Sequence, residues 1–285
     1  MPHVTLAHHI RANVAAALAE DGYDRDFTAQ LIPAQTLSHA TVITRESAVL
    51  CGTLWFEECF LTLDPNCRID WKAQEGARVE ANQTLCEIHG DARAMLTAER
   101  PALNFLQTLS AVATLTQHYV EAIKGTQAKI MDTRKTLPGL RMAQKYAVKT
   151  GGGHNQRIGL FDGVLIKDNH LAAIGGSVAE ALRRARAHAP RLVKIEIEVD
   201  TLRQLDQALE HGADVILLDN MTDAQIAEAV KRAAGRAALE VSGGVTLERL
   251  PKLAKLGVDF VSMGALTHSA RAMDLSLELD VVSAG

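Results

Sequence analysis

The chain has 285 residues, of which 47% are hydrophobic and 22% are charged, and its formal net charge is −4. This balance is typical of a globular protein and excludes disordered and fibrous chains. The weak negative charge leaves little long-range attraction for nucleic acid or for an acidic membrane surface. Aromatic residues make up only 4%, so a surface on which bases stack is not expected.

Neither a membrane span nor a targeting segment is expected. The chain has no apolar run that approaches the ~18–20 residues needed to cross a bilayer. The first 22 residues lack the apolar stretch and cleavage site of a signal peptide. The cysteines show no Cys-x-x-Cys spacing, which disfavours a disulfide framework and a zinc site. We therefore expect a cytoplasmic protein with reduced thiols at Cys51, Cys59, Cys67 and Cys86.

The first 125 residues mix helical and strand-like patterns. The predicted elements are a helix over 6–18, strands at 40–43 and within 68–88 with a turn at Ala81–Asn82, and a helix over 104–123. The long apolar helix is typical of a link between two domains. We expect an N-terminal domain over residues 1–112, with its linking helix running to about residue 125, and a second domain over residues 113–285.

The rest of the chain alternates short apolar strands with amphipathic helices, the pattern of βα units in a parallel sheet. This α/β pattern fits an incomplete barrel, and an open doubly wound sheet is the alternative. The strands are predicted at 128–131, 163–166, 193–199, 215–218, 238–241 and 260–263, and the helices at 178–188, 202–211, 223–234 and 247–256.

Polar residues follow each predicted strand. In a barrel the carboxyl ends of the strands meet on one face, where active sites are built, so these residues predict a single site. They are Asp132, Thr133, Arg134, Lys135, Lys167, Asp168, Asn169, His170, Glu198, Asp219, Asn220, Ser242, Gly243, Gly244 and Gly264.

Positive charge is concentrated in one part of the chain. Residues 133–170 contain seven Lys and Arg against two Asp, in a chain whose total charge is negative. A solvated helix face explains Lys149, but Arg134, Lys135 and Lys167 directly follow apolar strands. A local cationic pocket of this kind indicates a ligand with several negative charges.

Glycines follow two late strands, in SGG (242–244) and in MGALTH (263–268). Paired strand-to-helix turns of this type hold a phosphate in barrels. His268 is either a further donor to that phosphate or an ordinary residue at a helix start. The triplet Gly151–Gly153 follows a helical stretch, and it is either a flexible connection or a hinge or close backbone approach.

Glu198 and Asp219 end two neighbouring predicted strands. Several cations are expected near these two carboxylates, which leaves three interpretations. They form structural ion pairs, they bind magnesium, or they stabilise a developing positive charge. No His or Cys ligand set with metal spacing is apparent, which disfavours a tight transition-metal site. No Gly-x-Ser-x-Gly nucleophile motif occurs. A phosphorylated sugar with a pyrophosphate leaving group fits this combination.

Several segments in this order resemble the quinolinate phosphoribosyltransferases, also called carboxylating nicotinate-nucleotide pyrophosphorylases. The segments are AERPALNFLQTLSAVAT (98–114), TRKTLPGLR (133–141), KYAV (145–148), GGG (151–153), LIKDNH (165–170), EVD (198–200), LLDN (217–220), SGG (242–244) and MGALTH (263–268).

The resemblance implies an N-terminal α/β sandwich-like domain and a seven-stranded, incomplete α/β barrel. It implies a homodimer, with higher oligomers left open, in which the N-terminal domain of one subunit caps the barrel of the other. The implied reaction joins quinolinate to phosphoribosyl pyrophosphate with Mg²⁺ and gives nicotinate mononucleotide, pyrophosphate and CO2, a step of de novo NAD biosynthesis.

The resemblance also implies residue roles. The quinolinate contacts are Arg100 from the other subunit, Arg134, Arg157 and Lys167, and the phosphoribosyl pyrophosphate contacts are Lys135, Glu198, Asp219, Ser242, Gly243, Gly244, Gly264 and His268. Thr133, Gln156 and Met263 complete the expected substrate-binding set. Lys135, Lys167, Glu198 and Asp219 are the expected catalytic residues, and Glu198 and Asp219 the expected Mg²⁺ ligands, directly or through substrate or water. Gln156 stands where many relatives have His, so proton transfer at this position is not expected to be essential.

Three other functions are compatible with parts of this pattern. One is a related barrel enzyme of different specificity, such as a molybdate-transport-associated relative or a transferase that uses nicotinate. Another is a Schiff-base aldolase built on Lys167. The third is a non-catalytic module that binds a phosphorylated metabolite, although carboxylates beside a phosphate pocket disfavour a pure anion binder.

Overall fold

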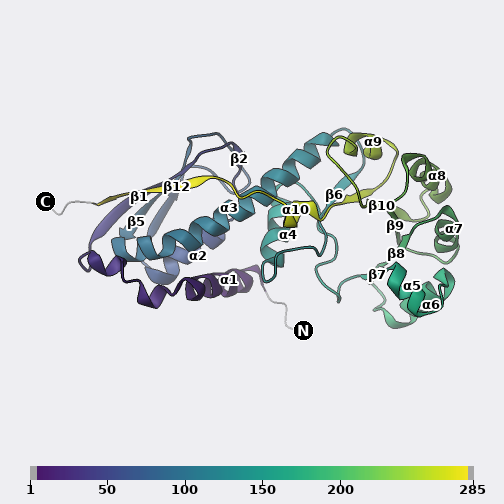
Figure 1. Ribbon diagram of the computed structural model, residues 1–285, viewed down its shortest axis with the longest axis horizontal. Coiled ribbons are helices and arrows are strands. Elements are labelled where there is room, and N and C mark those ends of the chain that lie inside the picture. Colours follow the sequence, from purple (N-terminus) through teal and green to yellow (C-terminus); the bar gives the residue numbers. More distant parts are fainter. Residues whose placement is uncertain (1–4, 282–285) are drawn as a thin grey trace. The chain divides into compact units, whose positions relative to one another are not determined.

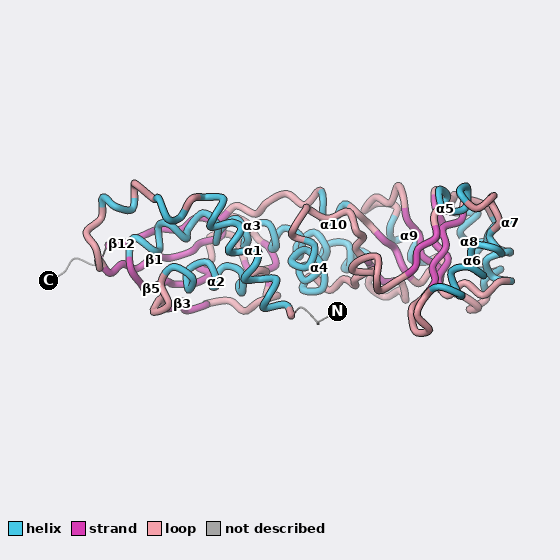
Figure 2. The backbone as a smooth tube through the Cα atoms, turned by 90° about the horizontal axis from the view of Figure 1, so that it is seen from below, coloured by secondary structure: helices cyan, strands magenta, loops and turns pink. Residues whose placement is uncertain are grey.

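The computed structural model describes residues 5–281 (Figures 1 and 2). Two compact units divide these residues. Unit 1 contains 5–117, 136–152 and 267–281, and unit 2 contains 118–135 and 153–266. In the described part of the chain, no helix is both long enough and apolar enough for a membrane span.

Unit 1 is built on an antiparallel sheet with the strand order β12-β1-β5-β3. The strands are β1 (Leu37–Thr44), β3 (Arg68–Trp71), β5 (Thr84–Asp91) and β12 (Leu275–Val281). A small separate pair consists of β2 (Ala48–Val49) and β4 (Arg78–Val79), and two 3-10 turns cover Tyr23–Arg25 and Ala29–Leu31. Helices of this unit are α1 (Leu6–Asp21), α2 (Thr53–Leu63), α4 (Arg141–Thr150) and the larger part of α3 (Ala92–Ala122).

Side chains of β1 alternate between buried and half-buried. Ala40 and Val42 are completely buried, whereas His39 and Thr41 are partly exposed. This period of two is expected for a sheet with one face against helices and the other face toward solvent. The helices lie on one side of the strands (Figure 1), which gives the two-layer arrangement expected for this part of the chain.

The predicted helix near the amino end is confirmed. Ile10, Val14 and Leu18 occupy one buried stripe of α1. The side chain of Thr5 caps the first turn, and Gly22 ends the helix with a φ of 71°. The long helix α3 begins at Ala92, twelve residues before the predicted start at residue 104. Pro101 lies inside this helix.

Unit 2 contains a parallel sheet with the strand order β6-β11-β10-β9-β8-β7. The strands are β6 (Lys129–Met131), β7 (Val164–Ile166), β8 (Ile195–Val199), β9 (Val215–Asp219), β10 (Ala238–Ser242) and β11 (Phe260–Ser262). The helices are α5 (Asp168–Ala173), α6 (Val178–His188), α7 (Leu202–Glu210), α8 (Asp223–Ala233) and α9 (Leu250–Lys255), and α10 (Ala265–His268) follows β11.

The strand order identifies an incomplete barrel and excludes the doubly wound sheet. The first strand in sequence, β6, pairs with the last, β11, and each strand from β8 to β11 pairs with its predecessor. The ring is open between β6 and β7. Helices α6, α7 and α8 lie outside the strands (Figure 1). Within the described residues, the barrel has six strands rather than the implied seven. In the gap beside β6, His154 forms only an isolated parallel bridge to Met131.

Long-range pairing assigns the carboxyl-terminal segment to unit 1. Strand β12 pairs antiparallel with β1 from Thr44↔Leu275 to Ser38↔Val281. Residues 136–152, which include α4, also belong to unit 1. The contacts thus divide the chain differently from the boundary expected at residues 112 and 113. The local sequence pattern gave no indication of either assignment, since each depends on contacts between distant segments.

The glycine triplet after α4 includes a close backbone contact. A Cβ atom on Gly151 would overlap the carbonyl oxygen of Ala113 and would lie 2.8 Å from the Cβ of Thr116. Glycine therefore allows the end of α4 to pack directly on α3 within unit 1. This contact favours the close-approach interpretation of the triplet over a flexible connection.

We expect Gly151→Ala to lower the free energy of unfolding by about 3 kcal/mol, because backbone atoms of α3 cannot move aside for the new methyl group. Gly22→Ala is the matched control, since Gly22 has a φ of 71° and open space around its Cβ position. Its cost is the left-handed backbone alone, about 1 kcal/mol. Urea unfolding measures both, and equal losses would contradict a packing role for Gly151.

Candidate active site

The carboxyl ends of the six parallel strands carry most of the predicted site residues. Thr133, Arg134 and Lys135 follow β6, Lys167 follows β7, Glu198 lies in β8 and Asp219 ends β9, Ser242 ends β10 before Gly243 and Gly244, and Met263 and Gly264 follow β11. Because parallel strands end at the same edge of a sheet, the structure brings these residues to one face of unit 2.

Acidic side chains of neighbouring strands point to the same side of the sheet. Asp219 pairs with Ser242 across β9 and β10, and Glu198 pairs with Leu217 across β8 and β9. Ile197 of β8 is completely buried on the opposite side. The alternation of side chains along each strand therefore directs Glu198 and Asp219 into the barrel interior.

An ion pair connects two of the expected catalytic residues. The Nζ atom of Lys167 lies 3.1 Å from the Oε2 atom of Glu198. The Glu198 side chain is 11% exposed and that of Lys167 is 47% exposed. The ion pair thus places the amine of Lys167 at the edge of the barrel, where its positive charge faces solvent and ligand.

The charges around Asp219 are mixed. Burial raises the pKa of Asp219, and the negative charges of Asp200 and Asp168 raise it further, whereas Lys167 and Lys135 lower it. The net result is a raised pKa, and burial is its largest cause. A bound cation or a developing positive charge beside this carboxylate would favour its ionised form.

Gly243 approaches the Asp219 side chain closely. Its φ is 82°, and a Cβ atom there would lie 3.0 Å from Oδ1 of Asn220 and 3.2 Å from Oδ1 of Asp219. The Nδ2 atom of Asn220 donates a hydrogen bond of 2.8 Å to Oδ2 of Asp219. Asn220 itself has a positive φ of 51°. Gly243 and Asn220 thus hold the carboxylate in place through a strained turn.

Two other predicted residues maintain the loops of this face. The hydroxyl of Thr133 accepts a hydrogen bond of 3.0 Å from the backbone N–H of Lys135. The N–H of Met263 donates to the carbonyl oxygen of Met131 at 3.0 Å, and Met263 is buried. These contacts connect the segments after β6 and β11.

Arg157 lies in the loop between α4 and β7. Its Nη1 atom donates to the carbonyl oxygen of Gly163 at 3.2 Å, and its buried Nε atom has no hydrogen-bond partner in the described part of the chain. Burial and the positive charge of Arg134 both lower its pKa, and Glu196 and Asp162 only partly oppose them. Two neighbouring guanidinium groups of this kind bind an anion well, because a carboxylate can satisfy both.

A buried pair of carboxyl groups lies beside this arginine. The Nε2 atom of Gln156 lies 3.2 Å from Oε2 of Glu196 and 3.5 Å from Oε1 of Glu240. Burial and the charge of Glu240 raise the pKa of Glu196 to about 9, and burial also raises the pKa of Glu240. The pair therefore retains a proton at neutral pH. These three residues and Arg157 line a cavity of about 460 Å³.

Glu240 is a residue that the sequence analysis missed. It lies between apolar residues of β10 and is only 1% exposed. Its position two residues before Ser242 on the same strand face is the only sequence signal that could have indicated an inward side chain. Gln156 was expected to contact substrate, and its side-chain amide donates hydrogen bonds to Glu196 and Glu240.

The raised pKa of Glu196 predicts a pH-dependent stability. Between its unfolded pKa near 4.5 and its folded pKa of about 9, the folded chain binds more protons than the unfolded chain, so stability falls as pH rises. Replacing Glu196 by Gln removes this loss. We expect the variant to gain stability relative to the native chain by up to about 1.4 kcal/mol per pH unit between pH 5 and 8.

Denaturant unfolding at a series of pH values measures this difference. Glu210→Gln, at an exposed position at the end of α7, is the matched control and is expected to follow the native chain. A difference between Glu196→Gln and the native chain that stays constant with pH would contradict a shared proton on the buried pair.

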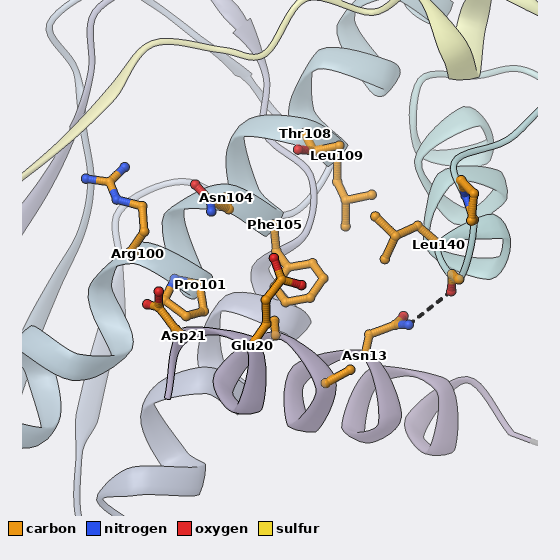
Figure 3. Close-up of a pocket in the computed structure, with 14 residues that line it drawn as sticks. Asn13, Glu20, Asp21, Arg100, Pro101, Asn104, Phe105, Thr108, Leu109 and Leu140 are labelled. Carbon is orange, nitrogen blue, oxygen red and sulfur yellow. Dashed lines mark hydrogen bonds between the residues drawn. The ribbon is translucent and has the colours of Figure 1, made fainter. Parts of the chain in front are cut away.

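Arg100 and His268 belong to unit 1. Arg100 lies on α3 at a cavity of about 370 Å³, and its side chain points away from the carboxylates of Glu20 and Asp21 (Figure 3). The side chain of Arg100 is 59% exposed and lies 3.7 Å from Glu99. Nδ1 of His268, at the end of α10, shares a hydrogen bond of 2.7 Å with the hydroxyl of Ser269. Since each unit is described by itself, these two residues are not placed relative to the barrel residues.

Comparison with known families covers nearly the whole chain. Residues 112–278 match the model of the quinolinate phosphoribosyl transferase C-terminal domain, and residues 26–110 match that of the N-terminal domain. The chain belongs to the quinolinate phosphoribosyl transferase family. The two matches meet between residues 110 and 112, next to the domain boundary expected from the sequence.

Two bacterial relatives of this family match over most of their length. The carboxylating nicotinate-nucleotide pyrophosphorylase of Mycobacterium leprae is 46% identical, over 94% of this chain and 96% of its own. The probable carboxylating nicotinate-nucleotide pyrophosphorylase of Bacillus subtilis is 41% identical, over 91% of this chain and 90% of its own.

Solved structures of the family share the whole fold. The nicotinate-nucleotide pyrophosphorylase of Francisella tularensis has a TM-score of 0.91 and 42% identity and covers 97% of this chain and 98% of its own. NadC from Streptococcus pyogenes has a TM-score of 0.93 and 38% identity and covers 98% and 99%. Human nicotinic acid phosphoribosyltransferase is 14% identical with a TM-score of 0.56, which indicates a shared fold alone.

Proposed function

We propose that this chain transfers the phosphoribosyl group of phosphoribosyl pyrophosphate to quinolinate, with loss of one carboxyl group as CO2. The products are nicotinate mononucleotide and pyrophosphate. The observation that carries this proposal is that cationic and acidic side chains follow neighbouring strands of one parallel sheet at their carboxyl ends, in a chain that belongs to the quinolinate phosphoribosyl transferase family. The cationic residues are Arg134, Lys135 and Lys167, and the acidic residues are Glu198 and Asp219, with Lys167 and Glu198 in an ion pair.

The two kinds of charge suit the two substrates. Quinolinate is a dianion, and Arg134 and Arg157 with the ammonium of Lys167 would bind and orient its two carboxylates. Lys135 and the turn at Ser242, Gly243 and Gly244 would bind the phosphates of the sugar, because turn N–H groups and lysine favour anions.

The reaction needs no nucleophile from the protein. The ring nitrogen of quinolinate attacks the anomeric carbon, the C–O bond to pyrophosphate breaks, and positive charge builds on the ribose before it passes to the pyridinium ring. Glu198 and Asp219 would stabilise that charge electrostatically. The carboxyl carbon next to the ring nitrogen then leaves as CO2, its bonding electrons stay on the ring carbon beside the positive nitrogen, and a proton completes the product.

Mg²⁺ is the proposed cofactor, with Glu198 and Asp219 as the residues that hold it, directly or through substrate or water. Carboxylate oxygens are the ligands that Mg²⁺ prefers, and the positions of Glu198 and Asp219 at the ends of adjacent strands support a cation there. When bound, the ion would supply positive charge to the pyrophosphate leaving group.

An aldolase that uses Lys167 as a Schiff-base lysine is the second candidate. The ion pair with Glu198 argues against it, since imine formation needs a lysine nitrogen that is free to attack a carbonyl group, and this nitrogen is engaged by a carboxylate. Borohydride treatment with substrate separates the two functions, because the transferase forms no imine.

The assay of the proposed function compares two acceptors. The purified chain is incubated with phosphoribosyl pyrophosphate, Mg²⁺ and either quinolinate or nicotinate, and nucleotide formation is followed by chromatography. We expect turnover with quinolinate and none with nicotinate. Turnover with nicotinate alone would overturn the substrate assignment, and absence of turnover with both would favour a non-catalytic binding protein.

We also propose a cytoplasmic homodimer in which Arg100 acts in the site of the other subunit. The exposed side chain of Arg100 at a cavity of unit 1 supports this role. The four free cysteines are buried, and burial raises the pKa of Cys59 to about 12 and that of Cys67 to about 11. Protonated, buried thiols suit a reducing compartment.

Mixing two inactive variants tests the shared site. Arg100→Ala and Asp219→Asn are each expected to be inactive, but their mixed dimers contain one intact site if Arg100 acts across the interface. After subunit exchange, activity should return to about a quarter of the native value, because half of the dimers have one working site of two. The control mixture of Glu198→Gln with Asp219→Asn should stay inactive, and a failure of the first mixture to regain activity would contradict the proposed arrangement.

A further inference from the structure

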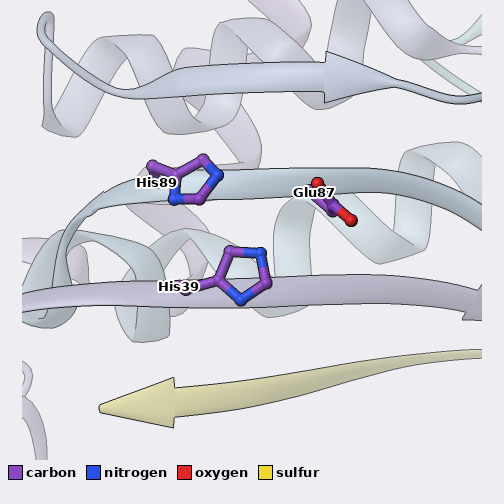
Figure 4. A group of neighbouring side chains, drawn as sticks. All are labelled: His39, Glu87 and His89. Carbon is purple, nitrogen blue, oxygen red and sulfur yellow. The ribbon is translucent and has the colours of Figure 1, made fainter. Parts of the chain in front are cut away.

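The solvent-facing side of the sheet in unit 1 carries two histidines and a glutamate in contact distance (Figure 4). His39 of β1 and His89 of β5 are direct cross-strand partners, and their ring centroids are 4.5 Å apart. Glu87 is two residues before His89 and therefore points to the same side of β5. One potential ligand atom from each of the three lies within 4.8 Å of the others.

The ligand atoms of this group are available. Within residues 5–281, neither imidazole ring has a hydrogen-bond partner, and His89 is exposed. The Oε2 atom of Glu87 lies 3.0 Å from the Nζ atom of Lys72, which leaves its second oxygen for another ligand. The helices of unit 1 lie behind the sheet (Figure 4), and the side chain of His39 is half-buried while that of His89 is exposed.

The surrounding charges also favour a cation. Asp280 of β12 is the cross-strand partner of His39, and Asp70 of β3 is the partner of Glu87. Arg68 opposite His89, Lys72 beside Glu87 and Arg45, which pairs with Glu278, are positive groups on this face. With Glu87 and Glu278, this face has four carboxylates against three cations, and a divalent ion would reverse that balance.

We propose that His39, Glu87 and His89 form a binding site for a divalent transition-metal ion, with Zn²⁺ as the ion that this ligand set suits best. Two neutral imidazoles and one carboxylate are a frequent ligand set for Zn²⁺, with water in the remaining position. The site is separate from the residues of the proposed reaction, all of which lie elsewhere in the chain. An ion here joins β1 to β5 and stabilises the folded state of unit 1.

Zn²⁺ titration of the full-length, untagged chain tests this site. The protein is first treated with EDTA and dialysed, then titrated with zinc chloride in competition with a chromophoric chelator. We expect saturation at one Zn²⁺ per chain, and a higher melting temperature with the ion than without it. His39→Asn and His89→Asn should each weaken binding at least about 100-fold, since even outer contacts of metal ligands affect affinity by 10–100-fold.

Two further variants examine the carboxylate. Glu87→Gln should weaken Zn²⁺ binding about 10-fold. Lys72→Met removes the competitor for Glu87, and since an exposed ion pair is worth about 0.2–1 kcal/mol, it should tighten binding up to about fivefold. His211→Asn, an exposed histidine of unit 2, is the matched control and should bind like the native chain.

Circular dichroism of each variant separates lost binding from lost folding, and the partly exposed positions of both histidines predict native spectra. Co²⁺ substitution gives a second measurement, with visible absorption bands of a four- or five-coordinate ion that disappear in His39→Asn. The proposal is overturned if the native chain shows no saturable Zn²⁺ binding. Equal affinity of the native chain and both histidine variants would also overturn it.

Discussion

Replacing Asp219 by Asn is expected to lower kcat by about 100- to 1,000-fold, with changes of less than about tenfold in KM for either substrate. Asp219 lies at the end of β9, where Gly243 and Asn220 hold its carboxylate in place. The substitution keeps the shape of the side chain and removes the negative charge that stabilises the ribose as it becomes cationic. A charge that develops only in the transition state affects turnover more than binding.

Steady-state kinetics with each substrate varied in turn measures this effect. Asp206→Asn on α7 is the control, because Asp206 is an exposed acid paired with Arg232 on the outside of unit 2. It should retain native kcat. Equal losses in kcat and in binding for Asp219→Asn would show that the carboxylate serves binding rather than the chemical step.

Replacing Arg157 by Met should raise KM for quinolinate about 30-fold or more and leave KM for phosphoribosyl pyrophosphate nearly unchanged. The Arg157 side chain is half-buried, and its buried Nε atom has no protein partner in the described residues, so a donor is available for a substrate carboxylate. Loss of one partner from a buried, hydrogen-bonded charge pair costs about 2–5 kcal/mol. The KM of Arg157→Lys for quinolinate should lie between that of the native chain and that of Arg157→Met, since lysine keeps the charge but not the two parallel hydrogen bonds.

Arg203→Met, at an exposed position of α7, provides the matched control for the loss of a guanidinium group. Quinolinate binding to each variant can also be measured directly by calorimetry in the absence of the second substrate. Equal increases of KM for both substrates in Arg157→Met would place the arginine outside the quinolinate-binding part of the site.

The barrel was predictable because its signals are local. Each strand from β6 to β11 is a short apolar run, and the polar residue at its end is adjacent in sequence, so the strand ends could be identified without any long-range information. The predicted helix over 178–188 agrees with α6, and the others agree within a few residues. Lys149 is exposed as predicted, whereas Lys145 on the same helix is buried.

Features that depend on distant contacts could not be predicted in this way. The sequence analysis missed the strand β12, although its residues alternate strictly between apolar and polar, and only its pairing with β1 gives it a place in unit 1. The helix α2 was missed because apolar residues occur on its exposed side as well as on its buried side. Leu54 and Leu61 are exposed, so the apolar pattern of the sequence does not mark the buried face. The group of His39, Glu87 and His89 joins segments about fifty residues apart, so no short metal-binding spacing announces it.

The central claim is that one barrel face binds quinolinate and releases its carboxyl group next to the ring nitrogen. Quinolinate labelled with ¹³C in either of its two carboxyl groups tests this claim directly, with phosphoribosyl pyrophosphate and Mg²⁺ present. We predict that the label next to the ring nitrogen leaves as CO2 in an amount equal to the pyrophosphate formed, while the other label stays in nicotinate mononucleotide. Retention of both labels in the nucleotide, or release of CO2 without pyrophosphate, would contradict it.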